Sequence, residues 1–85
     1  MWYVYFLKSQ KKKNWIYVGS TNNHERRLAE HNSGLVKSTK PYRPFIIIYK
    51  ESFSSEGEAR KREDYFKYWK GRIEKKKIVQ HSGVV

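Results

Sequence analysis

The stretch NWIYVGSTNNHERRLAEH (Asn14–His31) changes from a strand pattern to a helix pattern without an intervening loop. Its apolar part, WIYV at Trp15–Val18, is β-branched and aromatic, which favours a strand. Gly19 ends this predicted strand, and residues 20–23 (Ser, Thr, Asn and Asn) are all of the types that favour helix N-caps. The stretch therefore predicts a strand, a turn and a helix in direct succession.

The helix of this stretch has a start signal and a stop signal. Asn22 and Glu25 have the spacing of a capping box, with Asn in the place of Ser or Thr. We expect the helix to run from about His24 to His31, and the Asn-Ser-Gly sequence at 32–34 to stop it.

Upstream, WYVYFLK (Trp2–Lys8) is a second β-branched and aromatic run, separated from the first by the polar, turn-like residues 9–14. The two runs predict an antiparallel hairpin. A turn centred on Lys11 would place Tyr5 opposite Tyr17, whereas a shift by one residue would separate them, and the sequence leaves both registers open.

Downstream, a basic loop with two prolines leads to a continuous apolar run, which predicts the most buried strand. A second capping box then opens a long helix, Gly71 interrupts it, and a short last helix follows. These expected segments are the loop 35–44, the strand Phe45–Lys50, the helix Glu56–Lys70 and the helix Arg72–Gln80. The element order is β-β-α-β-α-α, which predicts an α/β (α+β) fold with a three-stranded antiparallel sheet flanked by helices.

The length of 85 residues indicates one domain, which we place at residues 1–80 with a flexible tail at 81–85. Hydrophobic residues make up 38% of the chain, so disorder is not expected. No apolar run approaches the length of a membrane span, the first residues are a poor signal peptide, and there is no cysteine. We expect a cytoplasmic monomer without a membrane partner.

The net charge of +11 points to a polyanionic partner. Nucleic acid is the first candidate, ahead of an anionic membrane surface or a structural role in the ribosome. Individual lysines can equally belong to a solvated surface. The predicted nucleic-acid contacts fall into a loop group and a helix group: Lys37, Lys40 and Arg43, and then Arg60, Arg62, Lys67 and Lys70.

The first helix places His24, Arg27, Leu28 and His31 within one arc. The simple interpretation is a half-buried helix with Leu28 inside and its charged neighbours at the rim. Because Leu28 and Ala29 are the only apolar residues available to face the sheet, Arg27 and His31 should also lie close to the protein body.

Glu63 interrupts an apolar stripe on the second helix, where Ala59, Phe66, Lys70 and Ile73 share its side and Trp69 is adjacent. A carboxylate among apolar residues needs a cation, and an ion pair with Arg62 or Lys67 is the structural interpretation. The functional interpretation is Mg²⁺, which a single carboxylate can hold because the ion keeps most of its waters.

Four motifs in this order resemble the GIY-YIG nuclease domain family, most closely its small stand-alone members, which are similar to the N-terminal nuclease domain of the bacterial excinuclease C subunit. The motifs are YVY at Tyr3–Tyr5, YVG at Tyr17–Gly19, ERRLAEH at Glu25–His31 and EARKRE at Glu58–Glu63. The similarity extends from about Trp2 to Lys77, and the four motifs together are specific although each is weak.

The resemblance implies a DNA-binding endonuclease that hydrolyses phosphodiester bonds with one divalent metal, Mg²⁺ or Mn²⁺, in DNA repair or processing, with RNA left open as substrate. It implies that Glu63 binds the metal, that Arg27 braces the phosphate, and that Gly19 lets the backbone approach closely. Tyr17 is the first candidate for the general base, although an unperturbed phenol of pKa about 10 is mostly protonated at neutral pH.

His31 is the second candidate for the base, and Tyr5 would orient the water or the phosphate. The chain departs from the family pattern at two places, where Tyr3 replaces a glycine and where no asparagine follows Glu63. The second departure keeps an alternative open, a catalytically weak or inactive nucleic-acid-binding module on the same fold.

Overall fold

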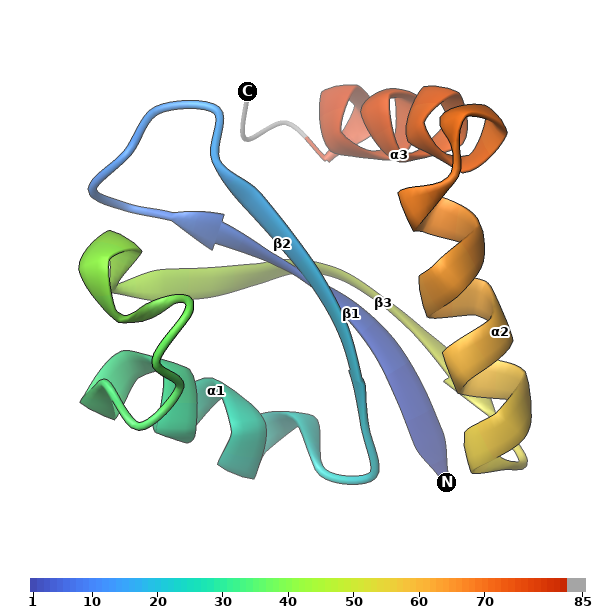
Figure 1. Cartoon of the computed structure of the whole chain (residues 1–85), viewed down its shortest axis with the longest axis horizontal. Coiled ribbons are helices and arrows are strands. Elements are labelled where there is room, and N and C mark those ends of the chain that lie inside the picture. The colour runs from blue at the N-terminus through green and yellow to red at the C-terminus, as the bar shows by residue number, and fades with distance from the viewer. Residues whose placement is uncertain (83–85) are drawn as a thin grey trace.

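The computed structural model describes residues 1–82, which fold into a three-stranded antiparallel sheet with helices on both faces (Figure 1). The expected element order and fold class are confirmed, with one additional 3₁₀ turn, η1. No helix in the described range is long and apolar enough to cross a membrane. The elements are β1 (Trp2–Ser9), β2 (Ile16–Thr21), α1 (His24–Ser33), η1 (Lys40–Tyr42), β3 (Phe45–Phe53), α2 (Glu56–Lys67) and α3 (Trp69–His81).

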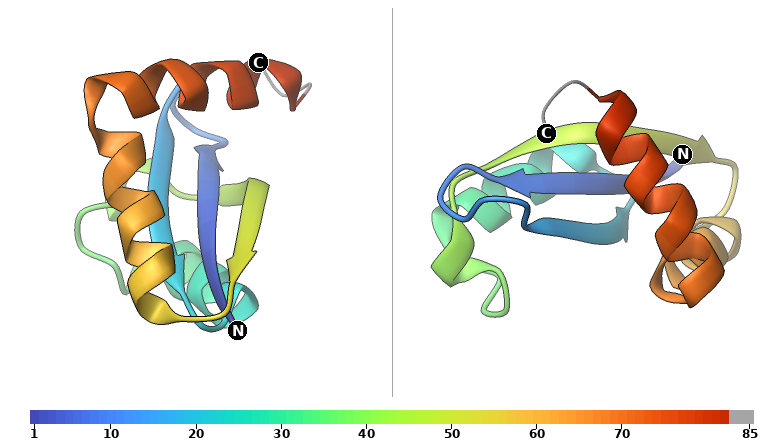
Figure 2. Two further views of the ribbon diagram at one scale, coloured as in Figure 1. Left: turned by 90° about the vertical axis from the view of Figure 1, so that its right-hand side faces the viewer. Right: turned by 90° about the horizontal axis from the view of Figure 1, so that it is seen from above.

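The central strand is β1, because the sheet order is β2-β1-β3. Successive residues of β1 point to opposite faces of the sheet. Val4 and Phe6 therefore join the core under α2 and α3, whereas Tyr5 and Leu7 join a second core under α1 and η1. Figure 2 shows the same layering, with α2 and α3 in front of the sheet in its left view and α1 behind.

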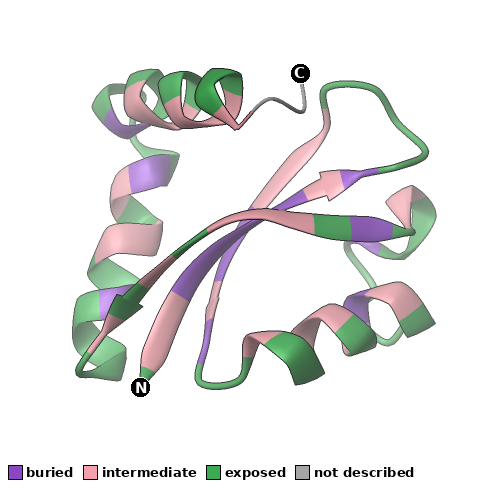
Figure 3. Ribbon diagram, turned by 180° about the vertical axis from the view of Figure 1, so that it is seen from behind, coloured by how far each residue is buried: buried purple, intermediate pink, exposed green. Residues whose placement is uncertain are grey.

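The apolar strand β3 is an edge strand and not the most buried one, so that prediction was wrong (Figure 3). Its residue Ile46 is 40% exposed, while Val4, Phe6 and Leu7 of β1 are fully buried. The physical reason is position, because β1 alone has a strand on each side as well as helices on both faces.

The hairpin turn is centred on Lys12, since Lys8 pairs with Ile16. Compared with a turn centred on Lys11, this register shifts the partner of each β1 residue by two positions along β2. Tyr5 therefore lies opposite Gly19, and Tyr17 is its diagonal neighbour on the same face of the sheet. Gly19 is part of this ladder, and β2 continues to Thr21 instead of ending at the glycine as predicted.

The first helix begins at His24 as predicted, but its N-cap lies one residue later than the capping box suggested. Asn23, and not Asn22, is the N-cap, and its side chain accepts from the Arg26 backbone N–H at 3.0 Å. Asn22 Oδ1 instead accepts from the Arg26 guanidinium at 3.1 Å. Gly34 ends the helix with a left-handed φ of 85°, as the stop signal predicted.

The break between the last two helices lies at Tyr68 and not at Gly71. Gly71 is buried in the first turn of α3, where a Cβ would lie 1.7 Å from the Tyr65 carbonyl oxygen. The glycine therefore allows α3 to pack closely against the end of α2.

Because the helical phase is lost at Tyr68, Lys70 and Ile73 do not extend the stripe of Ala59 and Phe66. Trp69 and Ile73 are mostly exposed. At the other end of α3, His81 still belongs to the helix, one residue beyond the predicted domain boundary at 80. Most of the predicted tail, residues 83–85, lies outside the described residues.

Candidate active site

The candidate site lies along the outer edge of β2, where side chains from both faces of the sheet meet. Figure 1 looks onto this edge, with β2 in front, α1 at the lower left and α2 at the right. Tyr17 and Gly19 of β2 face the α1 side with Tyr5, whereas Ser20 faces α2. One edge strand thus joins residues from α1 and α2.

Tyr5 and Tyr17 lie close together over Gly19. Their ring centroids are 6.3 Å apart. A Cβ on residue 19 would lie 2.6 Å from the Tyr5 hydroxyl oxygen and 2.9 Å from Tyr17 Cε2, both closer than real contacts allow. The glycine is therefore required for the space that the two tyrosine rings occupy, and not for ending the strand.

His31 is completely buried and connects Tyr5 to the loop after α1. The Tyr5 hydroxyl lies 3.0 Å from His31 Nε2, and Thr39 Oγ1 lies 2.8 Å from His31 Nδ1. Thr39 donates its own proton to the Val36 carbonyl oxygen at 3.3 Å, so it accepts from Nδ1–H. Nε2 is then an acceptor, and Tyr5 donates to it.

The pKa shifts agree with this arrangement. Burial raises the pKa of Tyr5, with a further contribution from Tyr17, and Arg27 only partly opposes the rise. Burial, together with the positive charge of Arg27, lowers the pKa of His31 to about 4, while Glu30 acts in the opposite direction. At neutral pH, Tyr5 therefore keeps its proton and His31 is neutral.

Arg27 extends from α1 toward the tyrosines and is held by Glu30. Its Nη1 lies 3.0 Å from Glu30 Oε1, and the two side chains are 34% and 32% exposed. Burial alone would lower the pKa of Arg27, but hydrogen bonds with Glu30 and Tyr5 raise it overall. The guanidinium is thus a fixed positive charge beside the Tyr5 hydroxyl.

Glu63 reaches the site from α2. Its carboxylate accepts from Ser20 Oγ at 2.6 Å and pairs with Lys67 Nζ at 2.8 Å. The predicted i+4 ion pair with Lys67 is present, and the alternative pair with Arg62 is not. Because the Glu63 side chain is only 19% exposed while that of Lys67 is 57% exposed, the lysine is the outer partner.

The donor set at Glu63 fits a hard divalent cation with few protein ligands. Within residues 1–82, no group of three or more His, Asp or Glu side chains could hold a metal ion. One carboxylate with a hydroxyl beside it suits Mg²⁺, which keeps several waters and takes oxygens from a phosphate. Zinc is not favoured, because its sites need several nitrogen or sulfur ligands.

Tyr17 is half-buried and reaches the surface at an open hollow of about 230 Å³. The hollow is also lined by Lys67, Arg72 and Lys75, which surround the tyrosine with positive charge. Of the two predicted candidates for the base, Tyr17 is therefore accessible, whereas His31 is buried with both ring nitrogens engaged.

The predicted nucleic-acid contacts lie in different surroundings. Lys37, Lys40 and Arg43 lie on the loop and η1 after α1, and Arg60 and Lys70 lie on the surface of α2 and α3. Arg60 pairs with Glu56 at 2.7 Å, and Lys70 Nζ lies 5.6 Å from the Trp69 ring.

Arg62 differs from the other six, because it forms ion pairs with Glu51 at 2.8 Å and with Glu74. Its guanidinium also lies 4.3 Å from the Phe66 ring centroid. Arg62 therefore holds the fold together and is a poor candidate for binding nucleic acid.

Sequence reasoning missed three residues of the site. Glu30 follows Arg27 by one helical turn, so its spacing could have revealed the pair. Ser20 was interpreted only as a cap-type residue, although it lies on the opposite face of β2 from Tyr17. Thr39 has no local signal, since only tertiary folding brings the loop to His31.

Comparison with known proteins relates the chain to one family. Residues 1–77 match the model of the GIY-YIG catalytic domain. A UPF0213 protein of Staphylococcus haemolyticus is 43% identical, covering 92% of this chain and 93% of its own length. A UPF0213 protein of Bacillus pumilus is 35% identical, covering 94% and 91%, and one of Clostridium perfringens is 41% identical, covering 76% and 69%. No solved structure matches significantly.

The family match covers the four motifs that suggested it and the residues gathered at the edge of β2. The Staphylococcus haemolyticus and Bacillus pumilus relatives span nearly the whole chain, so the resemblance is not confined to a fragment. The chain belongs to the GIY-YIG family of nuclease domains.

Proposed function

We propose that this chain is an endonuclease that hydrolyses phosphodiester bonds of DNA with one divalent metal, Mg²⁺ or Mn²⁺. One observation supports the proposal above all others. Tyr5, Tyr17, Arg27, His31 and Glu63, which come from four different elements, gather around Gly19 at one edge of the sheet. Packing alone does not require five polar or charged groups at one place.

Glu63 is the residue that would hold the metal, with Ser20 orienting the carboxylate. When bound, the metal would supply Lewis-acid stabilisation of charge on the phosphate and the leaving oxygen. Lys67 neutralises the carboxylate in the absence of another cation, and its exposed side chain is free to turn toward a phosphate oxygen.

Arg27 would brace the scissile phosphate. Glu30 holds only one edge of the guanidinium, so other N–H donors are available for phosphate oxygens. Since the side chain is already fixed, it stabilises the charge that develops in the transition state without having to reorganise.

Tyr17 is the residue that we assign as the general base, acting on a water molecule as its phenolate. The cations Arg27 and Lys67 both interact electrostatically with Tyr17, so two positive charges lie near the oxygen that would take the proton. Tyr17 is preferred to His31 because Tyr17 reaches the surface, whereas His31 is buried with both ring nitrogens engaged.

Tyr5 would orient the reacting groups, and His31 would position Tyr5. Because the Tyr5 proton is directed at His31 Nε2, the lone pairs of its buried oxygen can accept from Arg27, through which Tyr5 would act on the phosphate. His31 then acts through Tyr5 and does not contact the water.

We place the protein in the cytoplasm as a monomer, acting in DNA repair or processing. Its net charge of +11 suits a nucleic-acid partner. In the proposal, Lys37, Lys40, Arg43, Arg60, Lys67 and Lys70 contact phosphates, and Arg62 is left out for the reason given above.

The test compares wild type with Glu63→Gln in a plasmid-nicking assay with Mg²⁺, with Mn²⁺ and with a chelator. We expect nicking to require the metal and Glu63→Gln to slow it by at least about 10³-fold, because a metal ligand contributes several kcal/mol to the transition state. DNA affinity should change by less than about twofold. Glu56→Gln is the matched control, since this exposed carboxylate lies on the same helix and, within residues 1–82, forms its one ion pair with Arg60.

Equal nicking by wild type and Glu63→Gln would overturn the catalytic assignment. The second candidate function is nucleic-acid binding without cleavage, which is favoured by the absence of an asparagine in residues 64–85. Tight DNA binding without nicking in any metal would support this alternative.

A further inference from the structure

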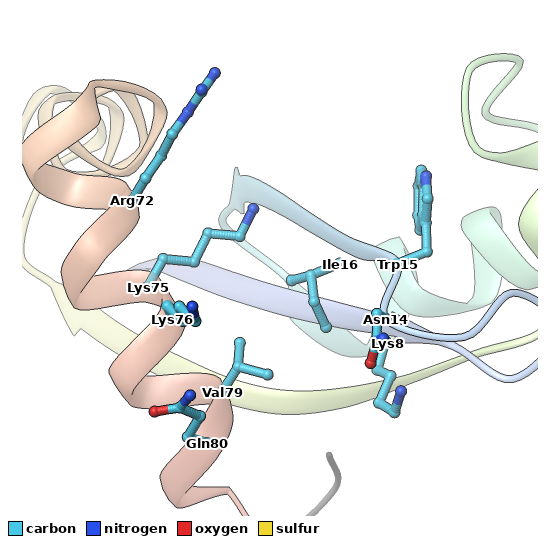
Figure 4. A pocket seen from close by; sticks show the side chains of 9 residues that line it. All are labelled: Lys8, Asn14, Trp15, Ile16, Arg72, Lys75, Lys76, Val79 and Gln80. Carbon is cyan, nitrogen blue, oxygen red and sulfur yellow. The ribbon is translucent and has the colours of Figure 1, made fainter.

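A basic groove lies between α3 and the end of the β1–β2 hairpin, and none of the residues assigned to catalysis lines it. It has a volume of about 690 Å³. Figure 4 shows its two walls, with Arg72, Lys75, Lys76, Val79 and Gln80 on α3 and Lys8, Asn14, Trp15 and Ile16 on the hairpin.

The charged residues of the groove are all cations. Lys8, Arg72, Lys75 and Lys76 line it, and no carboxylate does. Within residues 1–82, none of the four forms an ion pair. Burial and the neighbouring Arg72 lower the pKa of Lys75, which is the expected effect of a cation that lacks an anionic partner. The groove therefore offers unneutralised positive charge to an anion.

The floor of the groove is apolar. Ile16 and Val79 lie between the cations, and the Lys75 side chain extends across the groove toward Ile16 (Figure 4). Trp15 lines the hairpin end of the groove, with its ring turned away from α3 (Figure 4). Trp15 is stacked on Tyr42 with a centroid distance of 4.3 Å, which holds the indole in place. Cations beside a fixed aromatic ring are the combination that binds single-stranded nucleic acid, where bases as well as phosphates are exposed.

The groove is continuous with the candidate active site. Arg72, Lys75 and Ile16 line both the groove and the smaller hollow that contains Tyr17 and Lys67. Arg72 lies about one helical turn before Lys75 and Lys76, so all three project from the same side of α3. This row of cations leads along the helix toward Tyr17.

We propose that the groove between α3 and the hairpin binds an unpaired nucleic-acid strand and guides it to the site at Tyr17. The proposal rests on the proposed nuclease function and specifies its substrate class, a nucleic acid with a single-stranded segment next to the scissile phosphate. Duplex DNA is the less favoured occupant, because its paired bases cannot reach the apolar floor.

The experiment measures binding of a labelled oligothymidylate by fluorescence anisotropy over a range of salt concentrations. The groove variant is Arg72→Gln/Lys75→Gln. The matched control is Lys61→Gln/Lys77→Gln, which removes the same charge from exposed residues of α2 and α3 that line neither hollow. A blunt duplex of equal length is bound in parallel, and circular dichroism checks that both variants are folded.

We expect the groove variant to bind the single strand at least about tenfold more weakly than wild type. The slope of the logarithm of the binding constant against the logarithm of the salt concentration should be shallower by about 1.4 in this variant. The reason is that it loses two phosphate contacts, each of which contributes about 0.7 on a single strand. The control should differ from wild type by less than about threefold, and the groove variant should bind the duplex almost as wild type does. Lys75→Arg, which keeps the charge, should retain single-strand binding.

Equal single-strand binding by the groove variant and the control would overturn the proposal, and so would an equal loss for single strand and duplex. The outcome is separable from that of the nuclease proposal. If Glu63→Gln binds the single strand as wild type does and no protein cleaves DNA, the nuclease proposal fails while the groove proposal stands. If wild type cleaves a duplex with a single-stranded tail and the groove variant cleaves it at the same rate, the groove proposal fails while the nuclease proposal stands.

Discussion

Arg62 and Glu63 are neighbours on α2, yet they belong to opposite kinds of charged cluster. Arg62 points to the side of β3 and α3, where Glu51 and Glu74 use its hydrogen bonds and two aromatic rings cover it. Glu63 points to the edge of β2, where its outer partner is the flexible and mostly exposed Lys67.

The difference teaches how a charge that stabilises the fold can be told from one that is available for chemistry. The Arg62 cluster is closed, because a cation lies between two carboxylates and nothing further is needed. The cluster of Glu63, Arg27 and the two tyrosines is open, because it borders a hollow whose cations Arg72 and Lys75 form no ion pair within residues 1–82. Among these charged residues, the closed cluster of Arg62 (the closed side) should therefore govern stability, and the open cluster of Glu63 and Arg27 (the open side) should govern activity.

The largest expected effect on stability is its dependence on pH, which comes from His31, a buried residue that belongs to neither charged cluster. The pKa of His31 is about 4 in the folded chain, against about 6.5 when unfolded. The unfolded state binds more protons between these values, so stability falls as the pH is lowered from about 6.5 to about 4. At about 1.4 kcal/mol for each pKa unit, the loss approaches about 3 kcal/mol.

Urea unfolding followed by tryptophan fluorescence at several pH values measures this loss. His31→Gln should remove the slope between pH 6.5 and 4.5. Its remaining acid sensitivity should begin below about 4.5, where Glu51 takes up a proton, because hydrogen bonds from Arg62 and Tyr49 outweigh burial and lower the pKa of Glu51. A wild-type stability that is flat from pH 6.5 to 4.5 would contradict the prediction.

The next effect is that substitutions of the neighbours Arg62 and Glu63 should have opposite consequences, one for stability and the other for activity. Arg62→Gln leaves Glu51 and Glu74 without their cation and should lower the free energy of unfolding by about 2 kcal/mol, less than for fully buried pairs because the three side chains are 20–37% exposed. Glu63→Gln should change it by no more than about 0.5 kcal/mol.

Unfolding in urea at pH 7 measures the change in stability of both variants, and the nicking rate per folded molecule measures their change in activity. Arg62→Gln should keep its nicking rate, and Glu63→Gln should lose it. Similar losses of stability in both variants would remove the distinction between the closed and the open side.

The smallest effect concerns the support of Glu63 within the open side. Ser20→Ala removes the hydroxyl that donates to the carboxylate at 2.6 Å and should raise the metal concentration for half-maximal nicking by about tenfold. A magnesium titration of nicking measures this shift. Ser52→Ala on the exposed surface of β3 is the control, and identical titrations of the two variants would show that Ser20 has no such role.

Much of the fold could be predicted because its signals are local. Alternating aromatic and β-branched residues predicted β1 and β2, and the box at Ser55 and Glu58 predicted the start of α2, where Ser55 does accept from the Glu58 backbone N–H. The stop at Gly34 was likewise predictable, because a left-handed residue after a helix favours glycine.

The errors arose where distant parts of the chain compete. An apolar run such as Phe45–Lys50 does not reveal whether neighbouring strands will cover one edge or both, so β3 was wrongly expected to be the most buried strand. Gly71 looked like a helix breaker, although its lack of a side chain serves a close contact between helices. Similarly, the hairpin register depended on which turn residue lies at the centre.

By itself, the sequence determined the order of the elements, the basic character of the surface and the candidates Tyr5, Tyr17, Arg27, His31 and Glu63, because hydrophobic period, caps and motif spacing are encoded along the chain. Only the tertiary structure decided which of these groups meet, that Thr39 holds His31, and that Arg62 and Glu63 serve opposite sides of α2. The physical reason is that hydrogen bonds and ion pairs between distant elements depend on packing and register, which no local pattern specifies.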